Sequence, residues 1–222
     1  VRDVARVLSR YLAGVILRTF SHRTIVEFGK YFTNPIINGL SDAEHPCQAL
    51  ADYFTILEKA GKNAKPAIAF VGDGNNVLNS LILLSARIGG TIRYATPTHH
   101  EPDQKVVDQA QGIARETGAQ IAAFNDPKKA VDNADVVYTD VWVSMGQEKD
   151  REAKLQKFTG MQVNRDLMKH AKKDAFVMHC LPAHRGEEIT DDVIESKNSI
   201  IFDQAENRLH VQKAILLQMF LE

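Results

Sequence analysis

The sequence predicts an α/β protein built on a parallel sheet. From Pro66 onward, short apolar stretches typical of buried strands alternate with longer stretches that have helical periodicity. Strands that alternate with helices form parallel sheets whose faces are covered by the helices. Three of the expected strands also end in glycine-rich or polar residues, and the carboxyl ends of parallel strands lie at one edge of the sheet. The pattern therefore predicts both a fold and the place of a binding site.

The composition is that of an ordinary globular protein, with 44% apolar and 25% charged residues among 222. A net charge of −1 gives no general indication of nucleic-acid or membrane-surface binding. No apolar run approaches the length of a membrane span, and the first residues have no signal-peptide pattern. The two cysteines, Cys47 and Cys180, do not make a disulfide framework, which favours a reducing, cytoplasmic environment.

The first region, residues 1–61, is expected to begin with a helix over residues 1–12. This helix runs to the first residue without a capping residue, so we expect that preceding sequence is absent here. Its apolar stripe consists of Val4, Val7, Leu8 and Tyr11. The other expected elements are a strand at 15–17 that ends at Arg18, a helix at 22–32, a strand and turn at 35–39, and a helix that opens at His45-Pro46-Cys47-Gln48.

A polar break over residues 61–66 marks the expected domain boundary. A second domain is expected over residues 62–203, followed by a C-terminal helix over 204–222 that packs back on the first domain. The expected strands are 67–71, 91–95, 119–124, 136–139, 175–179 and 199–202. The expected helices are 76–88, 103–117, 127–133, 164–172, 190–196 and 204–221.

Three strand ends carry residues suited to a site. They are Gly72-Asp73-Gly74-Asn75-Asn76, Asp140-Val141-Trp142-Val143-Ser144-Met145-Gly146 and His179-Cys180-Leu181-Pro182. Together they offer a carboxylate, a thiol, amides and a hydroxyl, but no cluster with the spacing of metal ligands. Because side chains alternate along a strand, His179 and Cys180 face opposite sides of the sheet. We therefore interpret His179 as a core residue and not as a base for Cys180.

The same residues allow two other interpretations. Gly72-x-Gly74 at a strand-to-helix turn is typical of dinucleotide binding, but Val77 takes the place of the third glycine and the next strand ends without the required acidic residue. The helix start could still hold an anion. A cysteine nucleophile needs a base, for which His184 is the remaining candidate. A thiol that orients a substrate fits at least as well, and a small buried hydrophobe also fits.

Motifs along the whole chain resemble the aspartate/ornithine carbamoyltransferase family, and within it the enzymes that act on ornithine. They are His45-Pro46-x-Gln48, the Gly72–Asn76 and Asp140–Gly146 stretches, His179-Cys180-Leu181-Pro182 and Glu206-Asn207-Arg208. The resemblance implies two Rossmann-like parallel-sheet domains with the site between them, the first domain being incomplete in this chain. It implies carbamoyl transfer from carbamoyl phosphate to the side-chain amine of L-ornithine, which gives L-citrulline and phosphate in arginine biosynthesis or citrulline breakdown.

The resemblance also implies roles for individual residues. Those implied to bind carbamoyl phosphate are Arg18, His45, Gln48, Cys180, Leu181 and Arg208. Those implied to bind ornithine are Asn76, Asp140, Ser144 and Met145. Those implied to be catalytic are Cys180, Asp140, Arg208 and His45. The resemblance implies a homotrimer or a multiple of one, with no cofactor and no metal.

Carbamoyl transfer needs these residue types. The ornithine amine, with a free pKa of about 10.4, must lose a proton before it attacks, and nearby acceptors can orient it. Arg, His and Gln donate to the developing oxyanion, and arginine also matches the departing phosphate. The family's Ser-x-Arg-Thr-Arg phosphate loop would lie upstream of residue 1, so we expect residues 1–222 alone to be inactive and not to bind carbamoyl phosphate. The alternative is a carbamoyltransferase-like protein that binds an amino acid without catalysis.

Overall fold

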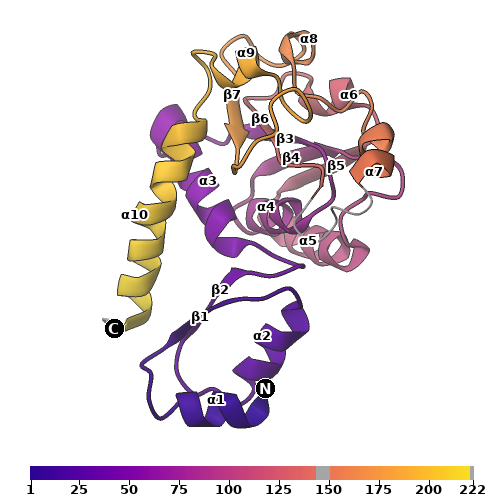
Figure 1. The fold of residues 1–222 in the computed structure, drawn as a ribbon. Helices are drawn as coiled ribbons and strands as arrows, with labels where there is room; N and C mark the ends of the chain where they lie inside the picture. The colour runs from indigo at the N-terminus through magenta and orange to yellow at the C-terminus, as the bar shows by residue number, and fades with distance from the viewer. Residues whose placement is uncertain (144–150, 221–222) are drawn as a thin grey trace.

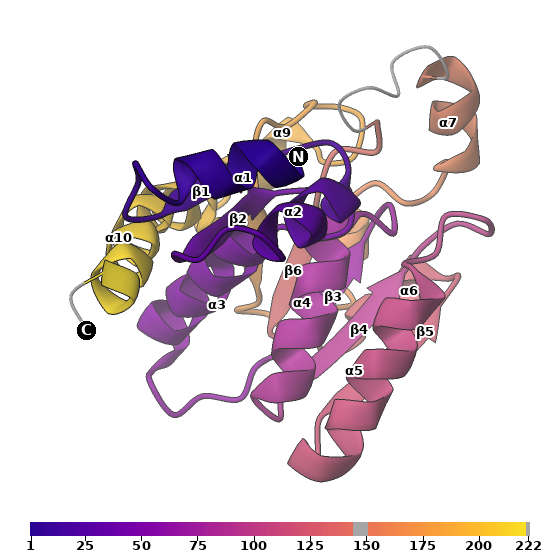
Figure 2. The same ribbon diagram turned by 90° about the horizontal axis from the view of Figure 1, so that it is seen from below.

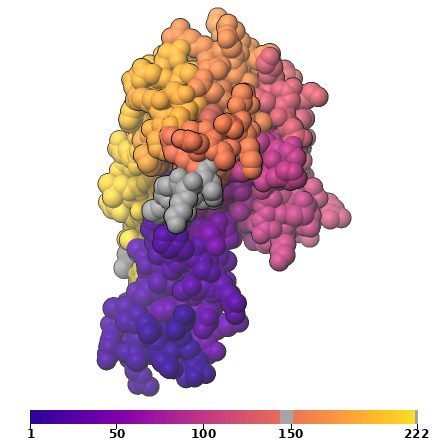
Figure 3. Space-filling view, turned by 45° about the vertical axis from the view of Figure 1, so that its right-hand side comes forward, coloured from indigo at the N-terminus to yellow at the C-terminus, as the bar shows by residue number. Residues whose placement is uncertain are grey.

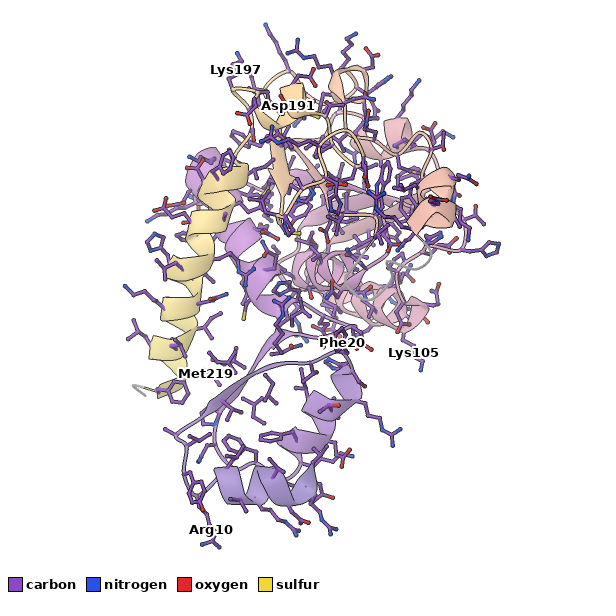
Figure 4. All side chains as sticks on the ribbon, viewed as in Figure 1. Arg10, Phe20, Lys105, Asp191, Lys197 and Met219 are labelled. Carbon is purple, nitrogen blue, oxygen red and sulfur yellow. The ribbon has the colours of Figure 1, made fainter. Side chains whose placement is uncertain are left out.

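The structure, a computed structural model, describes residues 1–143 and 151–220. They form a smaller N-terminal part and a larger part with a five-stranded sheet, and helix α3 (Pro46–Ala60) connects the two (Figure 1). In the space-filling view the N-terminal residues make a narrower lobe below the larger one (Figure 3). Arg10 lies at the far end of the small part, Asp191 and Lys197 lie at the opposite end of the molecule, and Phe20 lies between them (Figure 4).

The smaller part pairs two short parallel strands and packs two helices against them. Its elements are α1 (Arg2–Leu8), β1 (Val15–Arg18), α2 (His22–Gly29) and β2 (Ile36–Leu40). The buried core consists of Ala5, Phe28 and Phe32, with the two phenylalanine rings 5.2 Å apart. Helix α1 ends earlier than expected, and Val4 and Val7 remain exposed while Ala5 faces the core.

The larger part contains a parallel sheet with the strand order β5-β4-β3-β6-β7. Helices α3, α4 and α5 lie side by side on one face (Figure 2). The bounds of its further elements are β3 (Ala67–Val71), α4 (Asn76–Arg87), β4 (Thr91–Ala95), α5 (Gln104–Thr117), β5 (Gln120–Phe124), α6 (Pro127–Val131), β6 (Val136–Thr139), α7 (Arg151–Lys157), α8 (Arg165–Met168), β7 (Phe176–His179), α9 (Asp191–Ile194) and α10 (Ile201–Phe220).

The two faces of the sheet bury two separate apolar clusters, as the alternation of side chains requires. On β7, Val177 belongs to the cluster under α6, α8 and α9, whereas Met178 belongs to the cluster under α3, α4 and α5. Cys180 packs against the Met178 cluster and Leu181 against the Val177 cluster. The predicted parallel α/β fold and the predicted division of faces are confirmed.

The strand expected at residues 199–202 is wrong. Ser199 forms only an isolated bridge with Val177, and α10 already begins at Ile201. The next donor at this edge of the sheet, the backbone N–H of His179, is bonded at 3.0 Å by the side chain of Gln204 from within α10. A helix side chain therefore satisfies the edge that a further strand would have paired.

Three helix expectations also need correction. Helix α7 was not expected, because residues 151–157 are mostly charged and have no apolar periodicity. The helices expected at 164–172 and 190–196 are single turns, α8 and α9. Helix α10 is one 20-residue helix that packs along α3. Within the described residues, no helix combines the length and apolarity that crossing a membrane requires.

Candidate active site

The carboxylate of Asp140, which follows β6, joins the three strand ends. Asp140 is buried, and the Cys180 thiol donates a hydrogen bond to its Oδ1 over 2.9 Å. The Asn75 amide donates to its Oδ2 over 2.6 Å. The backbone N–H of Val141 also donates to Oδ1, over 2.7 Å. The predicted convergence of the loops after β3, β6 and β7 is therefore confirmed.

Asn75 is held in one orientation because both ends of its amide are used. It is the residue that caps α4, and its Oδ1 accepts hydrogen bonds from the backbone N–H groups of Val77 and Leu78 at 3.0 and 3.1 Å. Its Nδ2 must then point at Asp140. The cap occupies two of the N–H groups that an anion at the helix start would use, so an anion site there is disfavoured.

Cys180 is a neutral thiol. Burial and the adjacent Asp140 carboxylate raise the pKa of this thiol well above its usual range. A nucleophilic cysteine needs the opposite, a lowered pKa and a neighbouring base. His184, the base that sequence reasoning left open, instead faces Glu188, with 3.8 Å between Nδ1 and Oε2. The geometry therefore suits a thiol that donates and orients better than one that attacks.

His179 is a fully buried residue with both ring nitrogens bonded. Nδ1 accepts from the backbone N–H of Leu181 at 2.8 Å, so Nε2 carries the proton that it donates to Glu188 Oε1 at 3.0 Å. Leu181 has a φ of +56°, an uncommon value for a residue with a side chain, and precedes a cis peptide bond to Pro182. The ring of His179 thus fixes the backbone of the turn after Cys180, and its interpretation as a core residue holds.

A second cluster combines the start of α3 with α10. The Arg208 guanidinium donates to Gln48 Oε1, and Gln48 Nε2 donates to Asp52 Oδ1 at 2.7 Å. His45 is buried, and the pKa of its ring is lowered to about 4, mainly by burial and further by the charges of Arg208 and Arg18. This histidine is therefore neutral near pH 7. Arg18 itself is exposed at the carboxyl end of β1.

Three side chains of α4 hold the loop that leads into α3. Asn76 Nδ2 donates to the carbonyl of Ser41 at 2.6 Å, and Asn79 Nδ2 donates to the carbonyl of Ala43 at 2.9 Å. The hydroxyl of Ser80 accepts from the backbone N–H of His45 at 2.8 Å. These bonds place the His45 and Gln48 end of α3 against the same edge of the sheet as Asp140.

The structure brings several of the predicted site residues into two clusters. Asp140 and Cys180 are in direct contact, Gln48 and Arg208 are in contact in the second cluster, and the amide of Asn76 contacts the loop before α3. Ser144 and Met145 lie outside the described residues. Sequence reasoning missed Asp52 and Gln204, which hold the second cluster in place; the four-residue helical spacing from Gln48 was the available signal for Asp52. It included Asn75 only as part of the Gly72–Asn76 stretch, and the N-cap position was the signal for the particular role of Asn75.

The Gly72-x-Gly74 pattern has a packing explanation. A Cβ atom on Gly74 would lie 2.2 Å from the backbone carbon of Glu101 and 2.3 Å from the nitrogen of Pro102. The N–H of Gly74 also donates to the carbonyl of His100 at 2.8 Å. Glycine is needed here for the close approach of two loops, which agrees with the rejection of a dinucleotide site.

The comparisons with known proteins agree across the chain. The family model for the aspartate/ornithine carbamoyltransferase Asp/Orn-binding domain matches residues 64–219, and the model for the carbamoyl-P binding domain matches residues 1–58. Curated ornithine carbamoyltransferases from Thermococcus kodakarensis and Pyrococcus furiosus are 55% and 54% identical to this chain over 216 residues, which make up 97% of the chain and 69% of each relative.

Solved structures extend the agreement to three dimensions. The ornithine carbamoyltransferase of Pyrococcus furiosus superposes with a TM-score of 0.94 at 53% identity, over 99% of this chain and 70% of that one. The anabolic enzyme of Campylobacter jejuni gives 0.94 at 39% identity, over 98% and 72%. Both domain models, the relatives' identity and the superposition point the same way, and the chain belongs to the aspartate/ornithine carbamoyltransferase family.

Proposed function

We propose that this chain forms the site that transfers a carbamoyl group from carbamoyl phosphate to the side-chain amine of L-ornithine, giving L-citrulline and phosphate. The observation that carries the proposal is the cluster of Asp140, Cys180 and Asn75 at the carboxyl edge of the sheet. The same chain also contains the contact between Arg208 and Gln48, next to a neutral His45. An acceptor for an amine and donors for a carbamoyl group thus come from neighbouring elements.

On the ornithine side, the Asp140 carboxylate is an acceptor for the side-chain amine. An amine of this kind has a free pKa of about 10.4 and attacks only when it is deprotonated. Cys180 donates to Asp140 and lies beside it, so the thiol and carboxylate can orient the amine together. We assign the amino-acid end of ornithine to Asn76, Ser144 and Met145.

On the carbamoyl phosphate side, the donors are Arg18, His45, Gln48 and Arg208. A neutral His45 can donate one N–H to the carbamoyl oxygen, and its Nδ1 is buried with no hydrogen-bond partner among the described residues. Guanidinium groups match phosphate oxygens with paired donors. We assign the backbone of Cys180 and Leu181, which the ring of His179 holds in place, to this substrate as well. Donors fixed before the substrate arrives stabilise the charge that develops during transfer.

We also propose that the protein assembles as a homotrimer or a multiple of one, and that it works in the cytoplasm. The free state of Cys47 and Cys180 supports a reducing compartment. Gel filtration with light scattering tests the assembly. A mass that corresponds to a monomer or a dimer would overturn it.

The test of the function is citrulline formation by the full-length protein that contains this chain. We expect citrulline and phosphate in equal amounts when both substrates are supplied, and none when putrescine or aspartate replaces ornithine. Replacing Asp140 with Asn should lower turnover while carbamoyl phosphate still protects the protein against thermal unfolding. Ornithine binding by calorimetry without citrulline formation would instead identify a protein that binds an amino acid without catalysis.

A further inference from the structure

Asp52 is a buried carboxylate that no substrate role accounts for. It lies in α3, one helical turn after Gln48, and has no exposed surface. Its Oδ1 accepts from Gln48 Nε2 and from Gln204 Nε2, each at 2.7 Å, and its Oδ2 accepts from the Tyr138 hydroxyl at 2.9 Å. Three donors from α3, α10 and β6 therefore meet on one buried group.

The Asp52 network, which we define as Asp52, Gln48, Gln204 and Tyr138, reaches the site from two directions. Through Gln48 Oε1 it contacts the guanidinium of Arg208. Through Gln204 Oε1, which accepts from the backbone N–H of His179 at 3.0 Å, it contacts the residue before Cys180. Both halves of the site are thus connected to the same carboxylate.

The network determines which end of the Gln48 amide faces Arg208. With Asp52 in place, Nε2 points at the carboxylate and Oε1 is left for the guanidinium. The reversed amide would set its oxygen against the carboxylate and its NH₂ group against a cation, losing two charge-assisted hydrogen bonds. The second N–H of Nε2 then has a fixed direction.

The arrangement requires an acceptor at Oδ1 of Asp52, which the ionised and the protonated carboxyl both supply. Burial, only partly offset by the donated hydrogen bonds and the charge of Arg208, raises the pKa of this carboxyl to about 7. A buried carboxyl without partners is costly, and the three donors offset part of that cost.

We propose that Asp52 is a positioning residue for carbamoyl phosphate: it sets the orientation of the Gln48 amide and, through Gln48, the place of Arg208. The proposal rests on the carbamoyl transfer proposed above, with Gln48 as a ligand of that substrate. Asp52 itself touches no reacting atom.

The first test is the replacement of Asp52 with Ala in the full-length protein. The Gln48 amide is then free to turn, so KM for carbamoyl phosphate should rise ~10- to 100-fold, the effect of losing one hydrogen bond to a charged group. KM for ornithine should change less, because Asp140 keeps its hydrogen bonds from Asn75 and from the backbone of Val141, neither of which belongs to the network. Equal changes in both KM values would overturn the proposal.

A matched control is Thr55→Val. Thr55 is also fully buried on α3 and accepts a hydrogen bond from α10, from Asn207 Nδ2 at 3.0 Å, but it does not contact Gln48. We expect Thr55→Val to lower the melting temperature without raising KM for carbamoyl phosphate. A similar rise in this variant would show that any damage to the α3–α10 contact has this effect, and Asp52 would then have no particular role.

A double-variant cycle tests whether Asp52 acts through Gln48. If it does, Asp52→Ala should add almost nothing to the effect of Gln48→Ala on KM for carbamoyl phosphate. Fully additive effects would overturn the proposal.

Asp52→Asn covers the case in which the Ala variant fails to fold. The asparagine oxygen can still accept from both glutamines, and its NH₂ group can donate to the Tyr138 hydroxyl. KM for carbamoyl phosphate should therefore remain within about threefold of wild type. A rise as large as that of Gln48→Ala would contradict the proposal. Citrulline formation by the wild-type protein is measured first, so a failure of the proposed function is seen before any Asp52 variant is assayed.

Discussion

At the scale of single residues, amide side chains with both ends bonded hold the site together. Asn75 accepts from the start of α4 and donates to Asp140. Gln48 accepts from Arg208 and donates to Asp52, and Gln204 accepts from the backbone of His179 and donates to the same Asp52. An amide bonded at both ends cannot turn without losing two hydrogen bonds, so these residues fix the charged groups before a substrate binds.

We predict that Cys180→Ala in the full-length protein lowers ornithine turnover on the order of 100-fold without unfolding it. The thiol donates to Asp140 beside the proposed amine site, while Asp140 keeps two other donors. Citrulline formation and thermal melting are measured together. Cys47→Ala is the control, because this second cysteine is buried and its thiol points at the carbonyl of Asn38. Near wild-type turnover in Cys180→Ala would mean that Cys180 only packs.

We predict that His45 makes stability depend on pH. Its pKa is about 4 in the folded protein and about 6.5 when unfolded, so the unfolded chain binds more protons between these values. The stabilisation is complete above about pH 6.5 and is lost as the pH falls toward 4. Relative to His45→Gln, the free energy of unfolding of the wild type should therefore fall by about 3 kcal/mol between pH 7 and pH 4.

Urea unfolding of both proteins at several pH values measures this difference. Asp52 has the opposite sign, because its raised pKa stabilises the fold below pH 3.8 and that stabilisation is lost as the pH rises through about 7. It is present in both proteins and cancels in their difference. A difference that does not change with pH would contradict the neutral, buried state of His45.

At the scale of elements, the loops after the strands are fixed by close backbone packing as well as by hydrogen bonds. The turn from β3 into α4 touches the loop before α5 at Gly74, where no side chain has room. Since Asn75 and Asn76 follow directly, the position of this turn determines where two of the site amides point.

We predict that Gly74→Ala destabilises the protein by ~1 to 3 kcal/mol, the usual cost of forcing an atom into a packed place. Because its neighbours are backbone atoms, the turn must move, and ornithine turnover should fall with stability. Gly112→Ala in α5 is the matched control, since nothing lies within 4 Å of its added Cβ. In a helix that change should stabilise by about 0.5 to 1 kcal/mol. Urea unfolding that ranks the two variants in the reverse order would refute the packing argument.

At the scale of the whole molecule, α3 connects the small part to the large part. It follows β2 in the chain, yet it packs against α10 and α4. Buried polar side chains join α3 to α10, among them Asp52 with Gln204 and Thr55 with Asn207. The sequence boundary at residues 61–66 therefore does not coincide with a gap in the packing.

We predict that cutting the chain at this boundary does not separate its two parts. A site for a specific protease inserted at residues 62–64, which lie between α3 and β3, should be cleaved readily. The fragment that ends with α3 should then elute with the rest of the protein in gel filtration, and separate from it only in denaturant. Separate elution under native conditions would show that the contact of α3 with α10 is too weak to hold the parts together.

The sequence predicted the features that depend on periodicity and could not predict those that depend on distant partners. The strands β3, β6 and β7 are apolar and largely buried, so their positions were predicted to within one residue, and a parallel sheet then brings Asp140 and Cys180 to one edge. Which of Asn75 and Asn76 faces Asp140 depends on where α4 begins, to within one residue. The partners of Asp52 on β6 and α10 are 86 and 152 positions away in the chain, so no local sequence pattern predicts them.

The hydrogen bonds from α4 to the loop after β2 restrict how the sequence of that loop can vary. Within the part of the chain that the structure describes, the side chains of Asn76, Asn79 and Ser80 bind main-chain atoms of this loop, namely two carbonyls and one N–H. Hydrogen bonds to main-chain atoms do not depend on which side chains the loop carries, but they do depend on the number of residues between the bonded positions. Exchanges at Ala43 or Glu44 should be accepted readily, whereas one inserted residue would shift every later bond by a position. This loop should therefore tolerate substitutions but not insertions or deletions.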